Sequence, residues 1–193
     1  ERSSKTRFTN RNRIKTAQGS TWLSVPVLKS GFGQPLINEA MIEIDSKWSK
    51  KHFKTLVGNY SKSAYLNDHI SWFEDCYQQT WKLISPLLEY STDYLLKVLG
   101  ISIPMLKSSE MKAEGQKSDY ILNLCKEAEA TIYLSGPYGR DYLELDKFES
   151  AGIEVRFHEY NHPRYTQLYG EFLPYMSIVD LLFNEGPRSL DIL

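Results

Sequence analysis

Several features that would narrow the class of this protein are scarce in its sequence. Only two of its 193 residues are cysteines, Cys76 and Cys125, which excludes a disulfide framework and the paired cysteine spacing of a zinc site. Both lie among apolar residues and are predicted to be reduced core thiols. No apolar run approaches the roughly 20 residues of a membrane-spanning helix, and no signal-peptide pattern opens the chain. We therefore expect a cytoplasmic protein without membrane contacts.

An excess of charge of one sign is also lacking. The sequence has 23 Lys and Arg against 24 Asp and Glu, a net charge of −1 at pH 7. No overall field therefore attracts nucleic acid or anionic lipid, and neither is predicted as a partner. The four histidines show no metal-ligand spacing, so no metal site is predicted. Long linkers and internal repeats are absent, and the whole chain, 1–193, is predicted to form a single α/β domain.

What is present is a change of pattern along the chain. Strand-like alternation at 21–27 and 41–44 precedes a helical block at about 46–100, whose first helix can be capped by Asp45 or Ser46. Strand-like and helical segments then alternate, as in βαβ units. The predicted strands are 101–107, 131–135 and 153–160, and the predicted helices are 118–128, 140–151 and 177–183. This pattern predicts a mainly parallel, Rossmann-like sheet with flanking helices.

Polar residues follow each of the three later strands. Open parallel sheets bind ligands beyond the carboxyl ends of their strands, so these residues are expected to meet at one edge and form a small-molecule site. In chain order they are Ser108, Ser109, Ser135, Gly136, Arg140, His162 and Tyr165.

The turn at 135–139, SGPYG, joins a predicted strand to a predicted helix. Backbone N–H groups exposed there, together with the positive end of a helix, favour phosphate or carboxylate. The turn matches neither the dinucleotide nor the Walker fingerprint. A tight turn that uses Gly and Pro for geometry alone is an equal alternative.

His162 is the predicted acid–base residue, because an imidazole exchanges protons near neutral pH and this one stands in a loop. Glu159 and Glu171 are near enough in sequence to orient it. The alternative interpretation is a structural histidine before Pro163. His52, in contrast, is predicted to be solvated on an exposed helix face.

The segment NRNRIK at 10–15 alternates polar and basic residues. Arginine forks bind phosphate in a bidentate manner, so Asn10, Arg11 and Arg13 are predicted to hold an anionic group of the substrate. RNA contact lacks a supporting aromatic motif. A solvated strand or loop is the third interpretation.

Five segments together resemble the WbqC-like protein family in their order and spacing. They are NRNRIK at 10–15, LSVPV at 23–27, YLSGP at 133–137, HPRYTQLYGEF at 162–172 and SIVDLLFNEGP at 177–187. Family members are typically encoded among genes for O-antigen and other surface polysaccharides, and some are described as glycine or other acyl transferases. They usually begin with a strand and a loop of the type Q-P-x-Y-x-P-W. This sequence lacks that segment, so we expect part of the family's sheet to be missing.

The resemblance implies a transferase that acts on a nucleotide-activated amino sugar by N-acyl or glycyl transfer. Arg11, Arg13 and the turn at 135–139 would bind anionic groups, and His162 would be the general base. Tyr165 and Glu171 complete the predicted substrate contacts. A nucleotide-dependent ligase or nucleotidyltransferase and a non-catalytic binding or scaffold protein are the alternatives. No cofactor is evident beyond an acyl donor or a nucleotide, and the oligomeric state is not predicted.

Overall fold

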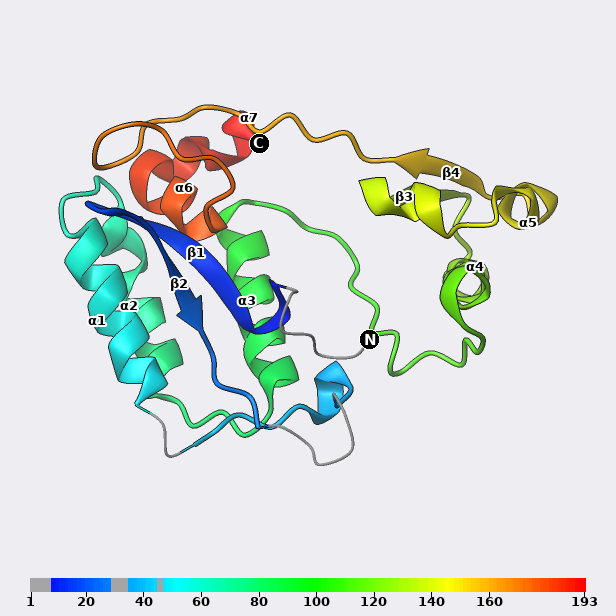
Figure 1. The fold of residues 1–193 in the computed structure, drawn as a ribbon, viewed down its shortest axis with the longest axis horizontal. Coiled ribbons are helices and arrows are strands. Elements are labelled where there is room, and N and C mark those ends of the chain that lie inside the picture. The colour runs from blue at the N-terminus through cyan, green and yellow to red at the C-terminus, as the bar shows by residue number, and fades with distance from the viewer. Residues whose placement is uncertain (1–7, 29–34, 45–46) are drawn as a thin grey trace. The chain divides into compact units, whose positions relative to one another are not determined.

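The computed structural model describes residues 8–28, 35–44 and 47–193, which form two compact units (Figure 1). The first unit comprises the described residues up to 102 together with 162–193, and the second comprises 103–161. The prediction of a single domain stays a prediction, because two compact units can belong to one domain or to two. The predicted cap at Asp45 or Ser46 lies outside the described residues.

A β-hairpin opens the first unit. Strands β1 (Arg11–Thr16) and β2 (Gly19–Ser24) pair antiparallel, with Arg13 opposite Trp22 and Ile14 opposite Thr21. The basic segment is therefore a strand, and the strand predicted at 21–27 begins two residues earlier. The segment predicted as a strand at 41–44 forms only isolated bridges, between Val27 and Ile42 and between Met41 and Leu83.

The predicted helical block is confirmed. It consists of α1 (Trp48–Tyr60), α2 (Leu66–Gln78) and α3 (Ile84–Val98). Near the C-terminus, α6 (Ile178–Glu185) and the short α7 (Ser189–Ile192) follow. One core joins the hairpin to α1, α2 and α6, and its fully buried members are Ile14, Leu56, Tyr60, Leu182 and Phe183. Burying these apolar faces is the main stabilising contribution to this unit.

The second unit contains one parallel strand pair. Strands β3 (Ile132–Ser135) and β4 (Glu154–Phe157) run in the same direction, as predicted. The helices of this unit are α4 (Lys117–Glu127) and α5 (Leu145–Ser150), and a 3₁₀ helix, η3, spans Pro137–Asp141. Its small core consists of Leu122, Cys125, Leu143, Phe148 and Ile153.

Two predictions about the second unit are wrong. The segment 101–107 is not a strand: Ile103, Met105 and Leu106 are 58%, 58% and 66% exposed, and no strand that the structure describes pairs with them. Because the segment lacks a partner, the sheet has two strands and is not clearly Rossmann-like, although the α/β class is compatible. The helix predicted at 140–151 is divided into η3 and α5, because the chain turns between them to bury Leu143.

Candidate functional site

The hairpin presents two chemically different faces. Because side chains alternate along a strand, Arg11, Arg13 and Lys15 belong to one face of β1 and Ile14 to the other. Trp22, opposite Arg13, supports both arginines: its ring centroid lies 4.4 Å from the guanidinium carbon of Arg11 and 5.4 Å from that of Arg13. Cation–π contacts of this kind hold the guanidinium groups in place.

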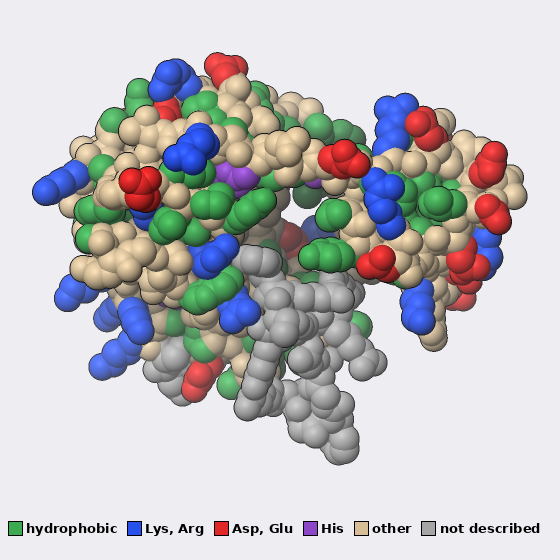
Figure 2. Space-filling view, turned by 45° about the horizontal axis from the view of Figure 1, so that its top comes forward, with side chains coloured by type: hydrophobic (Ala, Val, Ile, Leu, Met, Phe, Trp, Pro, Cys, Tyr) green, Lys and Arg blue, Asp and Glu red, His purple; other side chains and the backbone are tan. Residues whose placement is uncertain are grey.

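The segment 162–177 adds aromatic rings to this arrangement. The His162 ring centroid lies 5.0 Å from that of Tyr175, 5.8 Å from that of Phe172 and 6.2 Å from that of Tyr165. Arg13 connects the two parts, because its Nη2 donates a long hydrogen bond of 3.4 Å to the carbonyl of Tyr175. We call this group the basic–aromatic cluster; its members are Arg11, Arg13, Trp22, His162, Tyr165, Phe172 and Tyr175. Figure 2 shows hydrophobic side chains lying between Lys and Arg side chains on the visible face of the first unit.

The orientation of His162 is fixed by a backbone group. Its Nδ1 lies 2.7 Å from the carbonyl oxygen of Pro163. A carbonyl only accepts, so Nδ1 carries a proton, and if the ring is neutral Nε2 is its acceptor nitrogen. This is the tautomer a general base requires. The sequence suggested Glu159 or Glu171 for the orienting role, which the Pro163 carbonyl fills.

A buried polar network lies behind the basic–aromatic cluster. The Asp180 carboxyl group is fully buried and accepts hydrogen bonds from Tyr60 Oη at 2.6 Å, Tyr165 Oη at 2.8 Å and Gln167 Nε2 at 2.8 Å. Burial, followed by the charge of Asp180, raises the pKa of Tyr60 above its ordinary value. The Tyr60 hydroxyl therefore remains protonated and continues to donate.

Lys15 joins this network through two groups. Its backbone N–H donates to Tyr60 Oη at 3.1 Å, and its Nζ donates to the carbonyl of Glu171 at 2.7 Å. The side chain is only 3% exposed, and burial lowers its pKa while the charges of Asp180 and Glu171 oppose that shift. The predicted site residues did not include Lys15, Trp22 or Gln167. The two-residue spacing between Arg13 and Lys15 could have placed Lys15 on the same face of the strand.

The first unit thus brings together several of the predicted residues. Arg11, Arg13, His162 and Tyr165 belong to the basic–aromatic cluster, whereas the Glu171 carbonyl accepts a hydrogen bond from Lys15 of the buried network. Asn10 is not a member of the cluster: its side-chain amide donates to the carbonyl of Val25 at 3.0 Å, and it lines the pocket described below, as Arg11 also does.

The remaining predicted residues belong to the second unit. Ser108 and Ser109 lie in an exposed turn, and Gly136 precedes η3. Ser135 is buried, and its hydroxyl donates to the carbonyl of Gly136 at 3.1 Å. Arg140 pairs with Glu159 at 3.3 Å. The predicted edge made by three parallel strands is wrong, because 101–107 is not a strand, and the binding roles of these five residues stay predictions.

Gly139 shows what the SGPYG turn requires structurally. A Cβ at Gly139 would lie 2.0 Å from Ser135 Oγ, so only glycine permits this approach. The positive helix end expected after the turn is the start of η3, which has five residues and no side-chain cap. These contacts support the interpretation of the turn as a structural feature.

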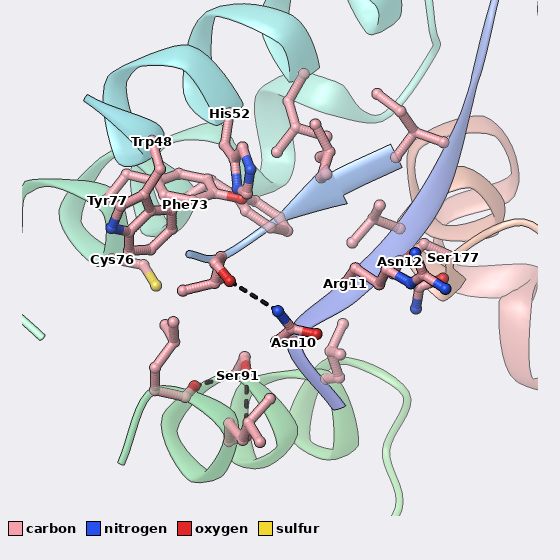
Figure 3. Close-up of a pocket in the computed structure, with 18 of the residues that line it drawn as sticks. Asn10, Arg11, Asn12, Trp48, His52, Phe73, Cys76, Tyr77, Ser91 and Ser177 are labelled. Atoms are coloured by element: carbon pink, nitrogen blue, oxygen red, sulfur yellow. Dashed lines mark hydrogen bonds between the residues drawn. The ribbon is translucent and has the colours of Figure 1, made fainter. Parts of the chain in front are cut away.

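The opposite face of the hairpin borders a pocket of about 230 Å³ within the first unit (Figure 3). Helices α1, α2 and α3 supply most of its walls, and the lining is mainly apolar. Its apolar and aromatic lining residues include Trp48, Trp72, Phe73, Cys76, Tyr77, Leu87, Leu88 and Leu95. Its polar residues include Asn10, Asn12, His52, Ser91 and Ser177.

His52 corrects the prediction of a solvated histidine. It is only 6% exposed, and its Nε2 lies 3.1 Å from the carbonyl of Ser24. Burial lowers the pKa of His52 to about 4, with the charge of Lys51 acting in the same direction and the hydrogen bond to Ser24 opposing it. The ring is therefore neutral at neutral pH. Burial also raises the pKa of Cys76 to about 11, so its thiol is neutral too.

The helices and the parallel strand pair are compatible with the α/β class. Its sequence matches the model of the WbqC-like protein family over residues 2–192, so the chain belongs to that family. It is 37% identical over 186 residues to the uncharacterized protein Rv1507c of Mycobacterium tuberculosis (strain ATCC 25618 / H37Rv). The matched region covers 95% of this chain and 80% of that protein. No solved structure matches the chain.

No helix in the described part of the chain combines the length and the apolar character needed to cross a membrane. Among the described residues, no group of three or more His, Cys, Asp and Glu side chains is arranged to hold a metal ion.

Proposed function

We propose that this protein is a transferase that acts on a nucleotide-activated amino sugar in surface-polysaccharide biosynthesis, by N-acyl or glycyl transfer. The observation that carries the proposal is the basic–aromatic cluster, in which a histidine oriented through Nδ1 packs on Tyr175, and the carbonyl of Tyr175 accepts a hydrogen bond from Arg13 on β1. Membership of the WbqC-like family supports a role related to polysaccharides.

The arginines would bind the diphosphate of the substrate. Guanidinium groups bind phosphate oxygens through paired, charge-assisted hydrogen bonds. The Nε atoms of Arg11 and Arg13 are buried and make no hydrogen bond to any residue that the structure describes. Buried donors without acceptors are destabilising, so an anion bound nearby would offset that cost.

His162 would act on the amine of the sugar. Its Nε2 would accept a proton as the amine nitrogen attacks the carbonyl carbon of the acyl donor. The new N–C bond forms as the bond to the leaving group breaks, and the leaving group departs with the electron pair and a proton. The rings of Tyr165, Phe172 and Tyr175 around His162 would exclude water and offer apolar surface to the sugar.

Calorimetric titration of the chain with a panel of UDP-linked amino sugars tests the binding step. Arg13→Ala should weaken binding by about ten-fold or more, the range expected for a charged hydrogen bond. The control is Arg156→Ala, which removes an exposed arginine of the second unit that pairs with Glu154 at 2.8 Å. Equal affinity in wild type and Arg13→Ala would contradict the proposal, and binding of ATP–Mg²⁺ alone would favour the nucleotide-dependent alternative.

His162→Asn tests the chemical step. The asparagine amide can still donate to the Pro163 carbonyl but offers no equivalent of Nε2, so the variant should bind the sugar nucleotide normally. Acyl transfer, followed by mass spectrometry of the sugar product, should fall by about 100-fold or more. Full transfer activity in His162→Asn would exclude His162 as the general base.

A further inference from the structure

We infer that the pocket between the hairpin and helices α1–α3 binds an uncharged ligand of bicyclic size that is mostly hydrocarbon and carries one N–H or O–H donor. The pocket borders the face of β1 that carries Ile14, opposite the face of the arginines. The inference does not depend on the proposed function, because it rests on side chains of α1, α2 and α3, and the pocket shares only Arg11 with the basic–aromatic cluster.

The size of the ligand follows from the volume of the pocket. An apolar protein cavity of about 150 Å³ holds benzene. The pocket here measures about 230 Å³, so by proportion it accommodates about nine non-hydrogen atoms. Protein interiors are otherwise close-packed, and an unfilled space of this size is destabilising. A ligand that fills it restores the lost contacts.

The charge of the ligand follows from the lining. Among the described residues, the pocket is lined by one charged side chain, that of Arg11. Its guanidinium lies over the ring of Trp22, which does not line the pocket. The thiol of Cys76 and the ring of His52 are neutral at neutral pH. The Arg11 guanidinium is engaged by the Trp22 ring, and a charged ligand packed against the α1–α3 side chains would lose its hydration, so this lining favours an uncharged ligand.

Aromatic walls favour a flat ring as the hydrocarbon part. The Trp48 and Tyr77 ring centroids lie 5.9 Å apart at 74°, and those of Trp48 and His52 lie 5.2 Å apart at 73°. Figure 3 shows these rings grouped on one side of the pocket, across from Ser91 on α3. Rings arranged at right angles present both edges and faces to a further ring, which is the geometry that aromatic pairs prefer.

Two polar side chains of the pocket, those of His52 and Ser91, can accept a hydrogen bond from a donor on the ligand. The ring of His52 uses its Nε2–H on the carbonyl of Ser24, so Nδ1 is the acceptor of the neutral ring. The Ser91 hydroxyl donates within its own helix, to the carbonyls of Leu87 at 2.7 Å and Leu88 at 3.0 Å. Both side chains already donate their protons to backbone carbonyls, so toward a ligand they can only accept, from its N–H or O–H group.

Three probes of about nine non-hydrogen atoms separate these requirements. Indole is uncharged and has a donor, benzofuran is uncharged without a donor, and benzoate is charged. In calorimetric titrations and thermal-shift assays of the intact chain, indole should bind and raise the melting temperature. Benzofuran should bind about five-fold more weakly, as expected for the loss of one hydrogen bond, and benzoate should not bind. Failure of indole to bind, or equal binding of all three probes, would overturn the inference.

Variants on α3 locate the binding in the pocket. Ser91→Leu fills the space and should abolish indole binding, whereas Thr92→Leu makes the same kind of change beside it at a residue that does not line the pocket. Should Ser91→Leu fail to fold, Leu88→Trp is a second filling variant at a half-buried lining residue. Unchanged indole affinity in a folded filling variant would overturn the inference.

Discussion

The buried imidazole of His52 makes a quantitative prediction about stability against pH. In the folded protein the pKa of His52 is lowered to about 4, mainly by burial, whereas an unfolded chain has the ordinary value of 6.5. Between these values the unfolded state binds a proton that the folded state does not. Stability from this group is therefore fully present above pH 6.5 and is lost as the pH falls toward 4.

The magnitude follows from the separation of the two pKa values. One pKa unit corresponds to about 1.4 kcal/mol, so the complete effect of His52 is about 3 kcal/mol. Roughly 2 kcal/mol of this should already be lost at pH 5, because the unfolded state is almost fully protonated there. A loss of this size is a large fraction of the free energy of unfolding of a typical domain.

Urea denaturation at pH 7.5, 6 and 5 measures the effect. All four tryptophans belong to the first unit, so their fluorescence follows the unfolding of the unit that contains His52. The matched variant is His52→Gln, whose amide can still donate to the Ser24 carbonyl but does not titrate. The wild type should lose about 2 kcal/mol more than His52→Gln between pH 7.5 and 5. Equal losses in both proteins would refute the assignment of a neutral, buried imidazole.

Further predictions concern buried groups and two glycines. Tyr60→Phe removes a hydroxyl that donates to buried Asp180 at 2.6 Å, and urea denaturation should show a loss of about 2–3 kcal/mol; a loss below about 0.5 kcal/mol would contradict the importance of this bond. Gly186→Ala should lower the melting temperature strongly, because φ at Gly186 is +54° and the new Cβ would lie 2.5 Å from the ring of Tyr65. The control is Gly58→Ala, because Gly58 lies inside α1 and a Cβ there would meet no atom within 4 Å. Calorimetry should show that this variant gains about 0.5–1 kcal/mol in free energy of unfolding. Similar effects of the two alanines would refute the reasoning.

Local sequence patterns predicted the helices and strands in which apolar residues recur at regular spacing. Apolar residues at helical spacing predicted α1, α2 and α3, and the later alternation predicted β3 and β4 with a parallel orientation. The sequence also identified Arg11, Arg13, His162 and Tyr165, since loop and strand positions rich in polar side chains are plausible ligand contacts. In the tertiary structure these four belong to one unit, whereas the sequence had grouped His162 and Tyr165 with residues of the second unit.

Other features were decided only by tertiary contacts. The pattern at 101–107 resembled a strand, but a strand requires a partner, and none pairs with this segment. His52 directly follows two lysines, Lys50 and Lys51, yet packing against Trp48 and Tyr77 buries it and changes its pKa. Asp180 meets Tyr60 across 120 residues of chain. Periodicity shows which side of a segment is apolar, whereas the partner that covers it, and therefore the local dielectric, depends on residues distant in sequence.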